Sequence, residues 1–180
     1  TVVVVLAFIP VTWGRNAEWS DEIGLLEHDF AVTSQNGQLL HALVRAHAAG
    51  GHAGRSMGLC TEHTDLVEKY PVVANECGQA FTQARQFKRA EVFYLQSLQQ
   101  NPAFGRTHFH LARLYVHMDR WLDAQTHFNL AIERERLPFL REFMSGVMLM
   151  DLYPHDHSRL VEARRHLENA LQLQPRAAQA

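Results

Sequence analysis

The sequence has few of the features that mark a cofactor-binding or disulfide-rich protein. Its 180 residues include 2 cysteines, too few for a disulfide framework, and no Cys-x-x-Cys pair suggests a zinc ribbon or a redox dithiol. The formal net charge is only −2, so no strong overall field attracts nucleic acid. The phosphate-binding loop, the dinucleotide fingerprint and the His-Glu-x-x-His motif of metalloproteases are all missing. We therefore expect no nucleic-acid partner, no cofactor and no resident metal.

The first segment of the chain is apolar and carries no charge from Thr1 to Trp13. It is too short to span a bilayer, which takes roughly 20 apolar residues. A buried strand and a hydrophobic helix packed on the domain are two interpretations. We favour a third, in which residues 1–14 end a truncated transmembrane helix, because the chain begins with Thr rather than Met and because Trp is typical of membrane interfaces. Residues 1–13 would then contact a membrane.

The strongest signal is an internal period of about 34 residues. The pairs related by it are Gly78 and Ala112, Phe81 and Tyr115, Phe87 and Trp121, Ala90 and Ala124, and Tyr94 and Phe128. Each copy places apolar residues at helical spacing and predicts two amphipathic helices. The small residues let two helices cross closely, and the aromatic residues fill the space between layers. Neither helix pair buries its apolar face alone, so we expect the copies to stack.

A third copy is offset from this period. Gly146 and Ala163 are 17 residues apart, where the other copies have 12, so about five residues are inserted around 153–157. This insertion affects the turn rather than the helices. Pro102 and Pro175 are each placed to end a second helix, and in the middle copy Pro138 stands two residues late for that role.

These residues resemble the tetratricopeptide repeat (TPR). The resemblance implies an all-α fold, in which antiparallel helix hairpins stack into a right-handed α-solenoid. It divides the chain into degenerate TPR-like helices at 15–70, full repeats at 71–104 and 105–138, and a TPR-like segment with an extended turn at 139–180. Within the degenerate part, 38–49 and 55–69 are predicted to form a helix pair. The structural positions of the repeats are Gly78, Phe81, Ala90, Pro102, Ala112, Tyr115, Ala124, Ala163 and Pro175.

A second resemblance concerns the run from Arg15 to Leu25, RNAEWSDEIGL. It looks like the junction that follows the last membrane helix in membrane glycosyltransferases with C-terminal TPRs, related to the O-mannosyltransferase-like proteins. It implies that this chain is the non-catalytic C-terminal part of a polytopic enzyme that transfers a sugar from a polyprenyl-phosphate donor. The chain would then lie on the periplasmic or lumenal side of a membrane. The alternative is a free-standing cytoplasmic TPR adaptor.

The TPR resemblance also implies a binding site for a protein or peptide. In this family the first helix of each pair lines a concave groove that holds extended peptides. The family positions carried onto this chain are Asn75, Gln79, Thr82, Arg106, Phe109, Arg113 and His117. An aromatic anchor flanked by Arg and amide side chains would grip a peptide backbone or a carboxylate. The set of Lys and Asn residues that forms the family's carboxylate clamp is missing, and an ordinary solvated helix face is the competing interpretation.

One motif suggests catalysis but has a simpler explanation. Residues 54–58, Gly-Arg-Ser-Met-Gly, match the nucleophile elbow of serine hydrolases, with Ser56 as the nucleophile. That motif requires a strand before it, and no β-branched run precedes Gly54. We therefore interpret the segment as a Gly-rich turn that opens a helix, and a hydrolase using Ser56 is a remote alternative.

The cysteines and histidines also have simple interpretations. Cys60 and His63 share a helix face, and residues 155–157 hold two more histidines, but nothing brings these groups together as the four ligands of a structural zinc. We expect Cys77 to be a buried, small, apolar thiol. The sequence does not argue for a disulfide between Cys60 and Cys77, although an oxidising compartment would permit one.

Overall fold

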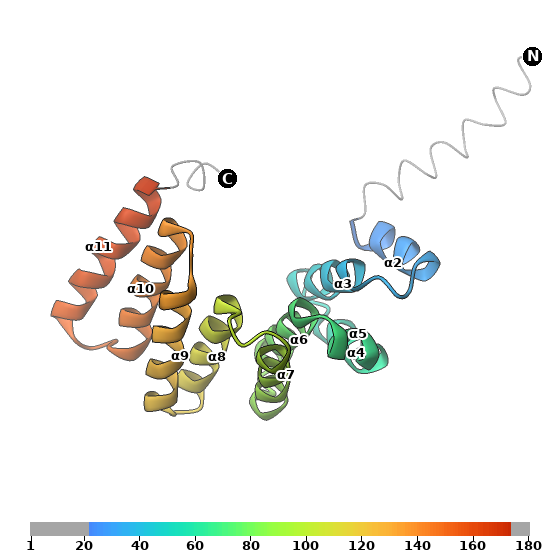
Figure 1. Cartoon of the computed structure of the whole chain (residues 1–180), viewed down its shortest axis with the longest axis horizontal. Coiled ribbons are helices and arrows are strands. Elements are labelled where there is room, and N and C mark those ends of the chain that lie inside the picture. The colour runs from blue at the N-terminus through green and yellow to red at the C-terminus, as the bar shows by residue number, and fades with distance from the viewer. Residues whose placement is uncertain (1–21, 174–180) are drawn as a thin grey trace, which may run out of the picture.

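Residues 22–173 are the part of the chain that this computed structural model describes, and they form a succession of α-helices that follow one another around an arc (Figure 1). No strand occurs within this range. The helices are α2 (Glu22–Val32), α3 (Gly37–Ala49), α4 (Ala53–Glu62), α5 (Thr64–Lys69), α6 (Pro71–Gln83), α7 (Phe87–Gln100), α8 (Gly105–His117), α9 (Trp121–Arg134), α10 (Pro138–Leu152) and α11 (His157–Leu173). The prediction of an all-α array of helix hairpins is confirmed.

The first helices of successive pairs keep the 34-residue period with little variation. Helices α3, α6 and α8 have 13 residues each and begin at Gly37, Pro71 and Gly105. The predicted ranges 71–104 and 105–138 therefore each contain one complete pair. The pair that begins with α3 keeps the same register, although its residues match the repeat pattern poorly.

The second helix of that pair is divided, where the sequence predicted one helix over 55–69. His63 separates α4 from α5 and has φ −118° and ψ 51°, outside the helical region. Its carbonyl accepts hydrogen bonds from the N–H groups of Leu66 and Val67, at 3.2 and 3.1 Å, and so opens the short helix α5. The His63 ring packs edge-on against Phe30 of α2, with 4.9 Å between ring centroids. The N-terminal repeat is thus compact, but its second helix is not continuous.

Small residues hold the two helices of each pair close together. A Cβ built on Gly78 would lie 2.5 Å from two ring atoms of Tyr94, so α6 and α7 meet at a glycine against an aromatic ring. A Cβ on Gly146 would lie 2.7 Å from Leu167 in the last pair. The other predicted small positions are also buried: Ala90, Ala112, Ala124 and Ala163. The predicted aromatic positions Phe81 and Tyr115 are buried as well, whereas Trp121 is 46% exposed.

The turns within the first three pairs share one backbone conformation. The second of three turn residues is left-handed in each, with φ of 78° at Gly51, 58° at Arg85 and 57° at Asp119. These positions are again separated by the repeat period. Only Gly51 adopts this conformation without a steric cost from a Cβ.

The sequence suggested that the five extra residues of the last pair lie in the turn, but they do not all lie there. The turn over 153–156 is one residue longer than the turns after α6 and α8. One residue is added to α10 after Gly146, and three are added to α11 before Ala163. The insertion therefore lengthens both helices as well as the turn.

The prolines have different positions relative to the helices. Pro102 follows Asn101, the C-cap of α7, as predicted. Pro138 does not end a helix: it occupies the first turn of α10, where its missing N–H has no intrahelical partner to lose. Pro175 lies outside the described residues, as does the apolar segment 1–14.

The two cysteines form a disulfide, so the expectation of a free buried thiol at Cys77 is wrong. The bond joins Cys60 of α4 to Cys77 of α6, with 5.7 Å between their Cα atoms. Both residues are fully buried. The sequence could not indicate this pairing because it depends on the packing of α4 against α6 across two repeats. The disulfide fastens the N-terminal repeat to the next one.

Among the helices of residues 22–173, none is both long enough and apolar enough to cross a membrane.

Candidate functional site

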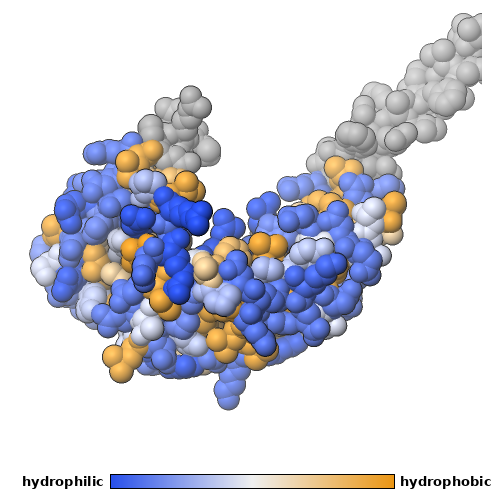
Figure 2. All heavy atoms as spheres, in the orientation of Figure 1, coloured by the Kyte–Doolittle hydropathy of each residue, from blue (hydrophilic) through white to orange (hydrophobic). Residues whose placement is uncertain are grey.

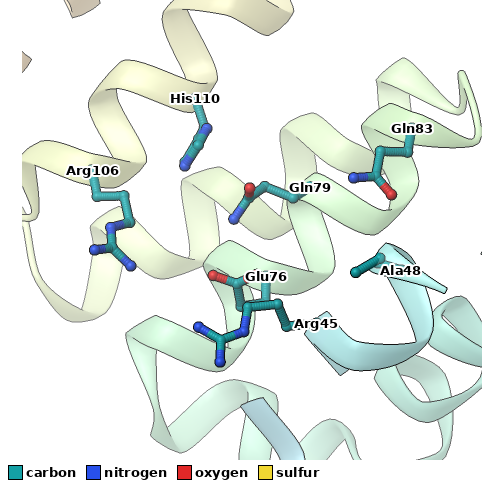
Figure 3. A pocket seen from close by; sticks show the side chains of 8 residues that line it. Arg45, Ala48, Glu76, Gln79, Gln83, Arg106 and His110 are labelled. Carbon is teal, nitrogen blue, oxygen red and sulfur yellow. The ribbon is translucent and has the colours of Figure 1, made fainter. Parts of the chain in front are cut away.

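A cavity of about 270 Å³ opens on the inner side of the arc, where the first helices of three successive pairs meet (Figure 3). We call it the α3–α6–α8 pocket. Its lining residues come from each of these helices: Arg45, Ala48, Ala49, Glu76, Gln79, Gln83, Arg106 and His110. Figure 2 shows that the molecular face around the hollow of the arc is largely hydrophilic, with scattered hydrophobic residues. The site is therefore a polar recess built by stacking repeats.

The repeat period brings these residues together. Gln79 follows Arg45 by one period, and His110 follows Glu76 by the same interval. Residues at equivalent positions of stacked repeats project from the same face of the solenoid, one layer apart. The pocket is thus built largely from rows of equivalent positions.

Two guanidinium groups are free to bind a ligand. Arg45 and Arg106 are exposed, and within the described part of the chain neither makes a hydrogen bond or an ion pair. Figure 3 shows both groups at the end of the pocket where Glu76 lies, while the amides of Gln79 and Gln83 line its length. Because a guanidinium group presents several donors in a planar fork, this end of the pocket suits a carboxylate or another anion.

Glu76 is the only carboxylate in the lining, and it is nearly buried, with 7% of the residue exposed. Its Oε1 lies 3.4 Å from Nε2 of His41 on α3. Burial alone would raise the pKa of Glu76, but the hydrogen bond from His41 and the electrostatic influence of His41, His110 and Arg106 hold that pKa below its ordinary value. Glu76 is therefore ionised at neutral pH, with the imidazole of His41 as its hydrogen-bond partner.

His110 is neutral at pH 7. Burial lowers the pKa of its imidazole to about 4; the nearby Glu76 opposes this shift, and the charges of Arg106 and Arg113 add to it. The ring stacks on Tyr94 with 6.2 Å between centroids and an interplanar angle of 14°. Figure 3 shows it projecting from α8 toward Gln79. As a neutral ring it offers one donor and one acceptor to a ligand.

Of the seven groove residues expected from the sequence, two line the pocket: Gln79 and Arg106. Two others are buried in the protein and cannot contact a ligand there. Asn75 is 1% exposed, and its Oδ1 accepts a hydrogen bond from Thr107 at 3.2 Å, which ties α6 to α8. Phe109 is 6% exposed and packs against Phe128, so it is a core residue rather than the predicted anchor.

The remaining three groove residues are engaged within the protein. The hydroxyl of Thr82 donates to the carbonyl of Gly78 at 2.8 Å. The Nε of Arg113 donates to Asp151 at 3.0 Å, an ion pair that links α8 to α10. The exposed ring of His117 stacks on Phe87 of the preceding repeat, with 5.7 Å between centroids.

Sequence reasoning missed several residues of this inner surface. Arg45, Glu76, Gln83 and His110 line the pocket, and the repeat interval from Glu76 to His110 was the signal that could have found two of them. Phe143 follows Phe109 by the same interval and is 43% exposed on α10. Its ring lies 6.2 Å from that of Phe109, centroid to centroid, and no further helix pair within residues 22–173 covers it.

Ser56 has a structural role. It lies inside α4, is fully buried, and donates a hydrogen bond to the carbonyl of Val44 at 3.0 Å. It precedes Ala90 by one repeat period and so occupies the small-residue position where two helices cross. A nucleophile elbow instead exposes its serine on a strand-to-helix turn, so this geometry does not support the hydrolase alternative.

The histidine-rich segments do not assemble a metal site in the described range. Between residues 22 and 173, no group of three or more His, Cys, Asp or Glu side chains is arranged to hold a metal ion. Cys60, one of the ligands considered from the sequence, is bonded to Cys77 instead.

Comparison with known proteins relates the fold to TPR structures. No protein-family model and no curated protein matches the sequence. The structure is similar to TTC0263, described as a thermophilic TPR protein in Thermus thermophilus, with a TM-score of 0.73, 16% identity, and coverage of 92% of this chain and 88% of that one. MamA from Desulfovibrio magneticus RS-1 gives a TM-score of 0.59 and 14% identity, covering 85% of this chain and 84% of its own. YrrB, described as a TPR protein with an unusual peptide-binding site, gives a TM-score of 0.57 and 11% identity. The match covers 90% of this chain and 81% of YrrB.

The class that the fold defines is the TPR-type right-handed α-solenoid. The identities are low, so these similarities establish the fold alone. The function has to be argued from the pocket.

Proposed function

We propose that this chain is a protein-interaction scaffold that binds an extended, acidic segment of a partner along the inner side of its arc. The observation that carries the proposal is the pair of unpaired guanidinium groups, Arg45 and Arg106, at one polar cavity. Charged side chains that lack internal partners are available for a ligand of opposite charge. No catalytic role is proposed for the chain.

The rest of the inner surface supports this proposal. Gln79 and Gln83 offer amide donors and acceptors suited to a peptide backbone in an extended conformation. YrrB, a solenoid of the same fold, is described as having a peptide-binding site, which adds support by analogy.

The proposal is tested by selecting peptides from a random phage-displayed library on the folded chain and measuring their affinities. Peptides rich in Asp and Glu should be enriched. They should bind the variant Arg45→Ala/Arg106→Ala at least about tenfold more weakly, because each lost charge-assisted hydrogen bond contributes about 1.5–3 kcal/mol.

The matched control is Lys88→Ala/Arg136→Ala. It removes the same two charges from exposed positions on α7 and in the turn before α10, outside the pocket. The control should bind the selected peptides as the wild type does. Enrichment of uncharged peptides, or equal weakening in both double variants, would contradict the proposal.

We also propose, as the context of this scaffold, the periplasmic or lumenal C-terminal part of a membrane glycosyltransferase-like protein. The run from Arg15 to Leu25 supports it by resemblance. The disulfide between Cys60 and Cys77 supports the compartment, because disulfides persist where the environment is oxidising. The free-standing cytoplasmic adaptor fits the TPR fold equally well.

The two contexts differ in the redox state of the cysteines inside the cell. Cells are quenched with trichloroacetic acid, the protein is denatured because both cysteines are buried in the fold, and its thiols are labelled with a maleimide reagent of high mass, with and without prior reduction. The labelled protein is then followed by its gel mobility. Labelling only after reduction would support the exported protein. Full labelling without reduction would favour the cytoplasmic adaptor and contradict the membrane context.

A further inference from the structure

The imidazole of His110 is placed where the charge of a bound ligand would act on it directly. The ring projects into the α3–α6–α8 pocket between Gln79 and Arg106 (Figure 3). Titratable or charged groups approach it from its own helix and from the three elements around it. They are Arg106 and Arg113 on α8, Glu76 on α6, His41 and Arg45 on α3, and Tyr94 on α7.

In the free protein these surroundings keep the ring uncharged. Burial disfavours the imidazolium ion, and the positive charges of Arg106 and Arg113 oppose it further. Glu76 favours the imidazolium, but His41 already partners this carboxylate. The ring therefore lacks a free negative partner, although it lies at the wall of a cavity that can admit one.

A carboxylate that enters the pocket changes this balance. It would be held by Arg45 and Arg106, whose positive charges it neutralises, and it would add a negative charge beside the imidazole. Both effects favour protonation of His110, because removing a like charge and adding an opposite charge stabilise the charged form. Exclusion of water by the peptide strengthens these interactions and also disfavours the charged ring, so His110 is protonated only where the carboxylate outweighs the added burial.

We propose that the pocket holds one Asp or Glu carboxylate of the bound peptide and that His110 takes up a proton as this carboxylate enters. The inference rests on the proposed function and assigns the ligand chemistry and the regulation of the same site. The transferred proton comes from solvent and binds the unprotonated ring nitrogen, and it leaves when the peptide dissociates.

The consequence is that binding strengthens as the pH falls. Because His110 is protonated only in the complex, binding the peptide also binds a proton, and the affinity for the peptide rises with the proton concentration. Binding begins to strengthen once the pH falls below the pKa of His110 in the complex. The gain approaches tenfold for each unit of the pKa rise only when the pH also nears the pKa of about 4 in the free protein. The protein would thus bind the peptide weakly at neutral pH and more tightly in a mildly acidic compartment.

The experiment measures the affinity of one defined probe by isothermal titration calorimetry. The probe is the hexapeptide acetyl-Gly-Asp-Gly-Asp-Gly-Asp-amide, whose carboxylates stay ionised at both pH 7.5 and pH 5.5 because Asp has an ordinary pKa of about 3.9. The wild type should bind it about threefold or more tightly at pH 5.5 than at pH 7.5, with net proton uptake seen in buffers of different ionisation enthalpy.

Two variants separate His110 from the general gain of positive charge at low pH. His110→Asn should lose the pH dependence, so that the ratio of its affinities at pH 5.5 and pH 7.5 is close to one. His117→Asn is the matched control, because His117 lies on the same helix but is exposed and stacked on Phe87 outside the pocket. This control should keep the pH dependence of the wild type.

Equal wild-type affinities at the two pH values, or a pH dependence that survives in His110→Asn, would overturn the inference and leave the peptide-binding groove intact. Absence of binding at both pH values would overturn the proposed function and the inference together.

An NMR titration of the His110 ring needs no substitution and covers the case of a variant that does not fold. The ring pKa should rise when the probe is added, and an unchanged pKa would overturn the inference.

Discussion

Replacing Gly78 with alanine should destabilise the array, because the new methyl group has no room. Its Cβ would lie 2.5 Å from Cδ1 and Cε1 of Tyr94, where carbon atoms in contact normally stay about 3.5–4.0 Å apart. The Tyr94 ring is buried and stacks against His110, and its hydroxyl lies 3.3 Å from the hydroxyl of Thr82, so the ring cannot simply move aside. Overpacking of this kind costs roughly 1–3 kcal/mol.

The better helix propensity of alanine, worth up to about 1 kcal/mol, offsets part of this cost, so we expect a net loss of about 1–2 kcal/mol. Gly54→Ala is the matched control. Gly54 is exposed near the start of α4, and a Cβ there meets nothing within 4 Å. The same substitution should therefore leave the free energy of unfolding unchanged or raise it by about 0.5 kcal/mol.

Urea denaturation followed by circular dichroism at the helical band measures both changes. A double-mutant cycle with Tyr94→Leu, which removes the ring atoms in question, should reduce the cost of Gly78→Ala. If Gly78→Ala is as stable as the wild type, or if its cost is the same in the Tyr94→Leu background, then α6 and α7 do not meet as the structure has them.

Three further predictions concern other parts of the molecule. Cys60→Ala/Cys77→Ala should lower the free energy of unfolding by about 3 kcal/mol, because the disulfide closes a loop between residues separated by 17 positions. Reducing the wild type with dithiothreitol should cause an equal loss of stability. No loss in either case would contradict the prediction. Arg85→Gly should raise the midpoint of urea denaturation, by up to about 1 kcal/mol in stability, because φ is 58° there; a lower midpoint would argue against the left-handed turn. The protein should lose stability as the pH falls from about 6.5 to about 4, because His110 and His127, whose pKa values are both lowered to about 4 by burial, take up protons more readily when unfolded. Melting curves across this range test it, and a flat profile would contradict it.

The spacing of small and aromatic residues was enough to predict the helix pairs at 71–104 and 105–138. Gly78, Ala90, Ala112 and Ala124 each fill a tight crossing that a larger side chain would open. This constraint is local and repeats in sequence, so it can be recognised without knowing the packing of the whole chain.

The repeat that begins at Gly37 was harder to recognise because other residues fill the same positions. Val44 stands in place of Gly78, Ser56 in place of Ala90 and Cys60 in place of Tyr94. These substitutions preserve close packing through a buried hydroxyl and a disulfide, which the repeat pattern does not encode. This repeat keeps the 34-residue register, but the residue types at its key positions do not reveal that register.

The groove was predicted less well than the fold, for a geometrical reason. Successive residues on a helix differ by about 100° in direction. Asn75 therefore faces the neighbouring first helix, where it meets Thr107, while Glu76 faces the pocket. Periodicity shows that Asn75 and Phe109 share a position, but not that the next repeat covers it. Which arginines lack a partner is likewise decided by neighbours distant in sequence, as the ion pair of Arg113 with Asp151 illustrates.

The central claim is that an acidic peptide binds where α3, α6 and α8 meet. The most direct test is an NMR titration of the assigned backbone and side-chain amides with a selected acidic peptide. The account predicts that the largest shifts fall on Arg45, Gln79, Gln83, Arg106 and His110, and that they shrink in Arg45→Ala/Arg106→Ala. Largest shifts on the outer helices α7, α9 and α11, with the pocket residues unchanged, would contradict it.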